Sequence, residues 1–228
     1  MTSAFIGSTC RVASLAALLV GGVLVASPVQ AAANAAGEVV KVVGRASAAT
    51  LDGNLRRLNE GTAVNSGDTV ITATSSFVRM KLSDGGFVVL RPNTRFQIAD
   101  YNYSDKPEDS RSVFSLLKGG FRAVTGIIGK RNRSAVSYRT AVATIGIRGT
   151  DLEVIDCSDG CPDLGTPPQL GLYFKVHQGG IDVNQTPFDA GKGGFAGSGL
   201  DPVEIDFDDP NNPLNSDPTP SADPEGCL

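Results

Sequence analysis

Residues 77–90 read Phe-Val-Arg-Met-Lys-Leu-Ser-Asp-Gly-Gly-Phe-Val-Val-Leu, and this stretch decides the fold class. Over residues 77–82 two sets of side chains alternate: Val78, Met80 and Leu82 on one face, and Phe77, Arg79 and Lys81 on the other. A period of two residues is the signature of a half-buried β-strand. The Asp-Gly-Gly sequence at 84–86 is typical of a hairpin turn. Residues 87–90 are therefore predicted to form the partner strand.

The same alternation of short apolar segments and turn residues continues on both sides of this hairpin. Twenty-seven glycines and thirteen prolines interrupt the chain, as an all-β protein requires. Further strands are predicted at residues 39–43, within 64–74 after a turn at 65–68, and at 95–103, 113–117, 135–142, 152–155, 170–176 and 181–184. Turns are predicted at Gly119-Gly120 and at residues 177–180, and no helix is expected after residue 31 beyond one short turn within 113–128. The fold class is all-β, either an elongated β-helix-like structure or a two-sheet sandwich, and periodicity alone does not choose between them.

The first 31 residues have the organisation of a secretory signal peptide. Arg11 is the only charged side chain before an apolar run from Val12 to Ala26, and small residues follow up to Ala31. A basic start, a short apolar core and a small-residue cleavage site define such a signal. The run is shorter than the roughly 20 residues of a membrane-spanning helix, which argues against the alternative of an uncleaved anchor. We therefore expect a periplasmic location, cleavage near Ala31 and no transmembrane span in the mature chain.

Charge is distributed unevenly along the chain. The sequence has 20 Lys and Arg against 24 Asp and Glu, yet residues 201–228 hold eight acids and no base. Residues 111–150, in contrast, hold eight bases and no acid. Beyond Asp208 the composition is mostly Asp, Asn, Pro and Ser, with too little apolar surface to offset the entropy of ordering. We predict a folded body followed by a disordered acidic tail over residues 201–228.

Eight short motifs follow one another in a distinctive order. They are 37–39 (Gly-Glu-Val), 58–64 (Leu-Asn-Glu-Gly-Thr-Ala-Val), 65–72 (Asn-Ser-Gly-Asp-Thr-Val-Ile-Thr), 78–86 (Val-Arg-Met-Lys-Leu-Ser-Asp-Gly-Gly), 90–94 (Leu-Arg-Pro-Asn-Thr), 117–121 (Leu-Lys-Gly-Gly-Phe), 140–150 (Thr-Ala-Val-Ala-Thr-Ile-Gly-Ile-Arg-Gly-Thr) and 176–183 (Val-His-Gln-Gly-Gly-Ile-Asp-Val). In this order they resemble the FecR domain, which occurs in the periplasmic part of iron-citrate signalling regulators and in many exported proteins. The resemblance assigns residues 37–200 to one FecR-like domain.

This resemblance also bounds the expected function. The signalling regulators join a cytoplasmic sigma-factor-binding segment to the periplasmic domain through a membrane helix, whereas only eleven residues precede the apolar run here. Anti-sigma activity is therefore not expected to carry over. The resemblance implies a non-catalytic periplasmic binding or interaction module, acting as an adaptor in envelope signalling or regulation. The alternative is a structural module that associates with cell-wall glycan or the membrane surface.

The residues offer little catalytic or metal chemistry. His177 is the only histidine, and no Gly-x-Ser-x-Gly elbow accompanies it, so a Ser-His-Asp triad is not expected. One histidine with scattered cysteines gives no zinc-ligand spacing. Asp206, Asp208 and Asp209 lack the central glycine and closing glutamate of a calcium-binding loop. We predict no catalytic residue, no metal and no cofactor.

Cys157 and Cys161 lie in a polar turn of sequence Cys-Ser-Asp-Gly-Cys. In an oxidising periplasm such a pair is expected to form a disulfide. Its gain is local rigidity, because closing a short loop saves little chain entropy. A redox-active role would favour Cys-x-x-Cys at a helix start, which this turn lacks. Cys227 remains as a leftover thiol, either free or paired with another chain.

The candidate binding residues are all basic. Lys130, Arg131 and Arg133 follow Gly129 and are predicted to form an exposed loop that contacts an anionic partner. Arg148 is the fourth candidate, because a guanidinium binds a carboxylate or holds a loop in place. The expected partners are an envelope protein, an anionic glycan or lipid surface, or the acidic tail of the chain itself, and nucleic acid is not expected outside the cytoplasm. The simpler interpretations are a solvated loop and a structural Arg148.

Overall fold

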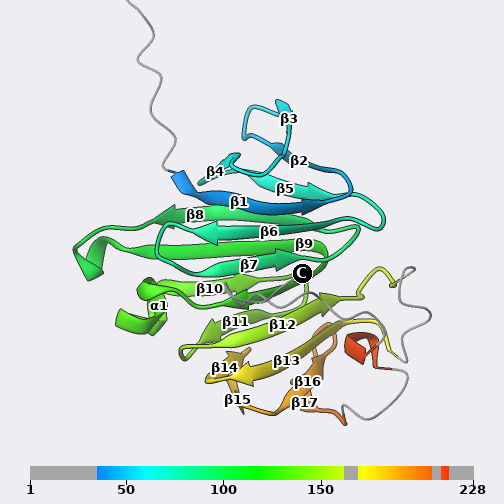
Figure 1. Cartoon of the computed structure of the whole chain (residues 1–228). Coiled ribbons are helices and arrows are strands. Elements are labelled where there is room, and N and C mark those ends of the chain that lie inside the picture. The colour runs from blue at the N-terminus through cyan, green and yellow to red at the C-terminus, as the bar shows by residue number, and fades with distance from the viewer. Residues whose placement is uncertain (1–34, 162–168, 207–211, 216–228) are drawn as a thin grey trace, which may run out of the picture. The chain divides into compact units, whose positions relative to one another are not determined.

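A computed structural model describes residues 35–161, 169–206 and 212–215, and β-strands dominate it (Figure 1). The strands form two sheets that share one long strand, β9 (Arg111–Val124). The pairings are antiparallel except for that between β9 and β10 (Val136–Arg139). The predicted all-β fold class is confirmed, and of the two predicted alternatives the chain adopts the two-sheet arrangement.

Each sheet is an ordered series of neighbouring strands. Sheet A runs from edge to edge through β4 (Ala63–Asn65), β1 (Ala35–Val43), β6 (Phe77–Leu82), β7 (Phe87–Leu90), β9, β12 (Asp151–Asp156), β13 (Leu172–Gln178), β16 (Gly193–Ala196) and β17 (Val203–Glu204). Sheet B runs through β3 (Leu55–Arg57), β2 (Ala46–Ala49), β5 (Thr69–Thr72), β8 (Arg95–Asn102), β9, β10, β11 (Thr144–Ile147), β14 (Gly180–Val183) and β15 (Thr186–Asp189).

Strand β9 passes from sheet B into sheet A at two glycines. Its residues 111–118 pair with β8, and its residues 119–124 pair with β7 and β12. Gly119 has a φ of +83°, and a Cβ atom there would lie 2.7 Å from the Cα of Thr94. The hydroxyl of Thr94 donates to the carbonyl of Gly120 and accepts from its N–H, both at 3.0 Å. The turn predicted at these glycines is therefore wrong, because they bend one continuous strand instead.

The two sheets enclose one hydrophobic core to which both contribute. The inward side chains of β6 are buried in it, which confirms the alternation predicted for residues 77–82. Aromatic rings from the two sheets meet at its centre. The ring of Phe121 in sheet A lies 5.2 Å from that of Phe96 and 5.0 Å from that of Tyr138, both in sheet B. Offset and tilted contacts of this kind add to the stability that burial alone gives.

Helical structure is limited to short segments. The described elements are the 3-10 turns η1 (Pro107–Asp109), η2 (Arg133–Ala135) and η3 (Pro213–Asn215) and the five-residue helix α1 (Ile127–Arg131). In the part of the chain that the structure describes, no helix is long and apolar enough to cross a membrane. The predicted signal peptide, residues 1–31, lies outside the described residues.

Part of the predicted acidic tail has regular structure. Val203 and Glu204 form β17 against β16, and η3 buries Leu214 beside Ile155 and Tyr173. These two segments differ from the disorder expected for residues 201–228, because β17 adds a strand to the edge of sheet A and Leu214 of η3 is buried against that sheet. Residues 207–211 and 216–228 lie outside the described residues.

Two core tyrosines make stability sensitive to alkaline pH. Burial, reinforced by the negative charge of Asp84, raises the pKa of Tyr101 and Tyr138 above the ordinary value of 10.0. Below this value both states keep the protons, whereas above it the unfolded chain releases them first. The free energy of unfolding should therefore fall above about pH 10, by about 1.4 kcal/mol per pH unit for each tyrosine. Urea titrations between about pH 9 and 11 measure this slope.

Tyr138→Phe supplies the control for this prediction. It removes the hydroxyl of one of these two tyrosines and should make their contribution to the decline above about pH 10 roughly half as steep. An unchanged slope in the variant would contradict the assignment.

A cationic face on sheet A as the candidate functional site

The register of sheet A aligns side chains from six strands in one row across its outer face. Successive side chains of a strand point to opposite faces, and Val78 and Met80 of β6 lie in the core, so Arg79 between them points outward. Cross-strand partners share that face. From β1 to β13 they are Lys41, Arg79, Val89, Arg122, Glu153 and Lys175, which we call the cationic row.

Positive charge dominates the cationic row, since four of its six members are cations and one is an acid. Neighbouring strands lie about 4.8 Å apart, so the backbones at Arg79 and Arg122 are separated by about 10 Å. The backbones at Arg122 and Lys175 have the same two-strand separation. The row therefore has cations on alternate strands at Arg79, Arg122 and Lys175, with Val89 and Glu153 between them.

Two of these cations are fixed by their neighbours. The guanidinium of Arg122 forms two hydrogen bonds with Asp151, Nε to Oδ1 at 3.0 Å and Nη2 to Oδ2 at 2.8 Å. The guanidinium of Arg79 lies 5.1 Å from the centre of the Phe87 ring. Forked pairs with a carboxylate and cation–π contacts both restrict where an arginine side chain can point. These contacts hold the two arginine side chains in place on the sheet.

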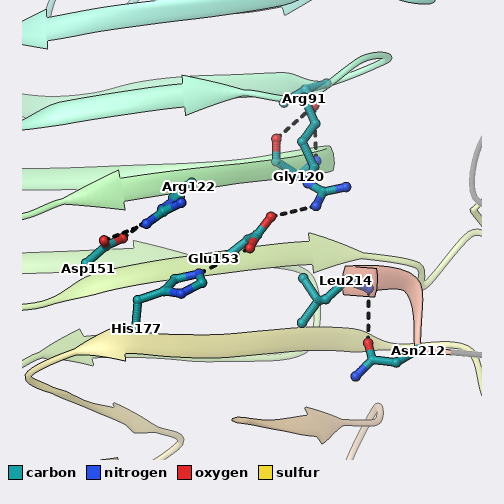
Figure 2. Close-up of polar contacts among 9 residues, drawn as sticks. Arg91, Gly120, Arg122, Asp151, Glu153, His177, Asn212 and Leu214 are labelled. Carbon is teal, nitrogen blue, oxygen red and sulfur yellow. Dashed lines mark hydrogen bonds and ion pairs between the residues drawn. The ribbon is translucent and has the colours of Figure 1, made fainter. Parts of the chain in front are cut away.

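A buried ion pair lies beside the row (Figure 2). Arg91, which directly follows β7, places Nη2 at 2.5 Å from Oε1 of Glu153, and the two side chains are 3 % and 9 % exposed. The other carboxylate oxygen, Oε2, is 3.2 Å from Nε2 of His177. His177 belongs to β13 and not to the predicted turn, and its ring faces the carboxylate of Glu153.

The predicted disulfide between Cys157 and Cys161 is confirmed. It belongs to a second apolar cluster on the outer face of sheet A, together with Ile155, Tyr173 and Leu214. Among residues 35–161, 169–206 and 212–215, no three or more His, Cys, Asp or Glu side chains are grouped to hold a metal ion. Cys227 lies outside this part of the chain.

Comparison with known proteins connects this architecture to a family. Residues 68–161 match the family model described as FecR protein. The chain carries a FecR domain. The match covers β5 to β12 and ends at the disulfide, inside the range 37–200 that the motif order predicts, so the resemblance is confirmed for its central part. No curated protein matches the sequence.

One solved structure similar to the chain is a candidate anti-sigma factor from Parabacteroides distasonis. The identity is 11 % and the TM-score is 0.42, with 60 % of this chain and 58 % of that chain covered. The chain thus spans less than two thirds of the length of that protein.

Within the FecR domain, the Gly-Ile-Arg-Gly-Thr stretch forms the corner between β11 and β12. The N–H of Arg148 and the hydroxyl of Thr150 both donate to the carbonyl of Gly180, at 2.8 and 2.7 Å. The guanidinium of Arg148 pairs with Asp189 at 3.0 Å, and Asp182 lies 3.8 Å from its Nε. Arg148 thereby ties the β14–β15 hairpin to the corner, in line with the structural interpretation of this residue.

The other three predicted binding residues lie at α1 and η2 of the FecR domain. Lys130, Arg131 and Arg133 are exposed, but the predicted loop is a short helix followed by a 3-10 turn. Asp84 anchors the helix, because its carbonyl and carboxylate accept the N–H groups of Ile127 and Ile128 at 3.0 and 3.2 Å. A role of the three cations in binding stays a prediction.

The sequence predicts only part of the cationic row. The alternation of residues 77–82 already places Arg79 on the polar face of a strand. Arg122 and Lys175 stand 43 and 96 positions further along the chain, by their residue numbers. Only the pairing of β7, β9, β12 and β13 brings them into line with Arg79, and no local signal encodes that register.

Proposed function

We propose that this protein is an extracytoplasmic, non-catalytic FecR-domain module that acts in envelope signalling by binding an acidic segment of a partner protein. The observation that carries the proposal is the cationic row, in which Arg79, Arg122 and Lys175 are evenly spaced on a rigid sheet. The match of residues 68–161 to the FecR family supports the link to signalling. The composition of residues 1–31, which is typical of a secretory signal peptide, supports the extracytoplasmic location.

The chemistry of the row favours recognition of an extended acidic chain. Complementary charge across an interface sets specificity and speeds association more than it adds affinity. A signalling contact must form and release quickly, so it depends more on specificity and fast association than on high affinity. Glu153, which is paired with Arg91, and Asp151, which is paired with Arg122, interrupt the positive charge, so the partner would meet separate positive positions and not a uniform patch.

A second candidate function rests on the exposed cations at α1 and η2. Lys130, Arg131 and Arg133 project from one short segment, as a contact to anionic glycan or lipid headgroups would require. This is the structural-module alternative, and it uses a different surface from the cationic row.

Photo-crosslinking in intact cell envelopes separates the two candidates. A photoreactive amino acid is placed at Lys41 or Lys175 in the row, at Arg131 in α1, or at the exposed Lys106 as a matched control, and the products are analysed by mass spectrometry. We expect one dominant protein partner from the two row positions and none from Lys106. The yield should fall severalfold at high salt, because exposed charge contacts are screened.

The opposite pattern would overturn the adaptor proposal. Products from Arg131 alone, carrying glycan or lipid, would favour the structural module. The same products from Lys106 as from the row would show that the row has no special role.

A further inference from the structure

An open hollow lies on the outer face of sheet B, over β2, β3 and β5 (Figure 1). Ser47 and Ile71 alternate with core residues along β2 and β5, so they point outward. Ser47 and Ala73 are small, whereas Leu55 and Ile71 beside them are longer, and this difference leaves the space. Its volume is about 360 Å³, and pockets for small molecules range from about 300 to 1,000 Å³. We call it the sheet B hollow.

Two arginines and two large apolar side chains line the sheet B hollow. Leu55 is 67 % exposed and Ile71 is half-buried, so apolar surface faces the space. Arg57 is the cross-strand partner of Ser47, and Arg45 stands two positions before Ser47. Diagonal neighbours of this kind lie about 7–8 Å apart, within reach of each other's long side chains. Both guanidinium groups can therefore meet at one anion, and no described residue that lines the hollow is acidic.

The backbones at both arginines are fixed, whereas their charged groups are available. The N–H of Arg45 donates to Oγ of Ser76 at 2.9 Å. Arg57 stands between Arg56, which is held by an ion pair, and Leu58, which is buried in the core. Within the described part of the chain, the guanidinium groups of Arg45 and Arg57 form no ion pair or hydrogen bond. A guanidinium matches the oxygens of a carboxylate or a phosphate, so the hollow offers two donors for such a group.

Positive charge continues from the hollow across sheet B. The cross-strand row that begins at Arg57 passes through Ser47 and Ile71 and reaches Arg95 and Lys118. Three members of this row are cations and none is an acid. Arg95 and Lys118 are exposed and form no ion pair with another described residue. A surface with one sign of charge raises the local concentration of ions of the opposite sign.

We propose that the sheet B hollow binds an amphiphilic anion, a molecule with one carboxylate or phosphate group and a short aliphatic chain. The head group accepts hydrogen bonds from Arg45 and Arg57, and the chain covers Leu55 and Ile71. Both parts are needed, because an anion without a chain leaves the apolar surface in water and a neutral chain gives the guanidinium groups no acceptor. Neither arginine lies within residues 68–161, so the family match does not imply this site.

Octanoate, kept below the concentration at which it forms micelles, is the probe that tests this site. It is titrated into the isotope-labelled protein, and the backbone amide signals are followed by nuclear magnetic resonance. We expect saturable shifts at Ser47, Leu55 and Ile71. Ser137 and Gly146, which pair with each other elsewhere on sheet B, should not shift. Acetate, which lacks the chain, and octanol, which lacks the charge, should each bind at least tenfold more weakly than octanoate.

Two variants test the charged and the apolar part separately. Arg45→Gln and Arg57→Gln together should weaken octanoate binding at least tenfold. Ser47→Leu keeps both arginines but fills the hollow, and it should weaken binding to a similar extent. Arg139→Gln is the matched control, because Arg139 is an exposed arginine on β10 of the same sheet. It should change the affinity by less than twofold, and unchanged amide signals far from each substitution verify that the variants are folded.

Sedimentation with vesicles of phosphatidylglycerol identifies the source of the anion. Octanoate binding together with vesicle binding that Arg45→Gln and Arg57→Gln weaken indicates a membrane lipid. Octanoate binding alone indicates a free amphiphile, and both results support the inference.

Three outcomes would overturn the inference. They are equal affinity for acetate and octanoate, unchanged octanoate affinity in the double arginine variant, and vesicle binding without octanoate binding. These samples contain no partner protein, and the hollow lies on sheet B whereas the cationic row lies on sheet A. The result is therefore independent of the proposed function.

Discussion

Replacing Arg91 with Met is expected to lower the free energy of unfolding by about 3–5 kcal/mol. The reason is the environment of Glu153, whose side chain is 9 % exposed and lies 2.5 Å from the guanidinium of Arg91. Removing one partner of a buried pair leaves the other charge in a medium that solvates it poorly. The double variant Arg91→Met/Glu153→Leu should recover most of the loss, because a well-packed apolar pair avoids the desolvation cost of both charges.

Urea unfolding followed by far-ultraviolet circular dichroism measures this effect, since the chain contains no tryptophan for fluorescence. Lys192→Met is the matched control. Its partner is Glu204, and the two side chains are 54 % and 56 % exposed, so the loss should stay below about 1 kcal/mol. Equal losses in the free energy of unfolding for Arg91→Met and Lys192→Met would show that the buried pair stabilises the fold no more than the exposed pair does.

Gly179→Ala should cost about 2–5 kcal/mol, the second largest effect. Gly179 has a φ of +75°, and a Cβ atom there would lie 1.9 Å from the carbonyl oxygen of Gly149. About 1–2 kcal/mol of the loss comes from the left-handed backbone conformation. About 1–3 kcal/mol more comes from the clash, because the oxygen belongs to the backbone of the β11–β12 corner and cannot rotate away.

Gly191→Ala separates the two contributions. Gly191 has a similar φ of +81°, but no atom lies within 4 Å of the position that its Cβ would take. This variant should lose only the conformational part, about 1–2 kcal/mol. The same urea titration measures both. If Gly179→Ala is no worse than Gly191→Ala, the close approach of the two glycine-containing segments does not contribute to stability.

Local sequence was sufficient for those features that depend on neighbours in the chain. The strand at residues 77–82 is confirmed because alternation alone determines which side chains a pleated strand can bury. The turn at Asp84-Gly85 is confirmed because Gly85, with a φ of +80°, adopts the conformation that such a turn needs. The Cys157–Cys161 disulfide is confirmed for the same local reason, since a polar turn with only three residues between the two cysteines brings the sulfurs together.

The additional role of Asp84 could not be read from its hairpin. Its carboxylate accepts the N–H of Ile128, which lies 44 positions further along the chain. The bulge-like crossing of β9 at Gly119 is a similar case, because a pair of glycines permits a turn and a bend equally well. The choice is made by Thr94 and by the pairing of the two halves of β9 with different sheets.

The sequence by itself determined an all-β chain, a FecR-type order of motifs, the local turns and a mildly basic body with an acidic end. The tertiary structure alone decided that two sheets share β9 and that Arg79, Arg122 and Lys175 fall into one row. It also decided that Arg148 holds a hairpin and that Leu214 returns to sheet A. The physical reason is that side-chain direction follows from local backbone geometry, whereas strand register depends on hydrogen bonds between residues far apart in the sequence.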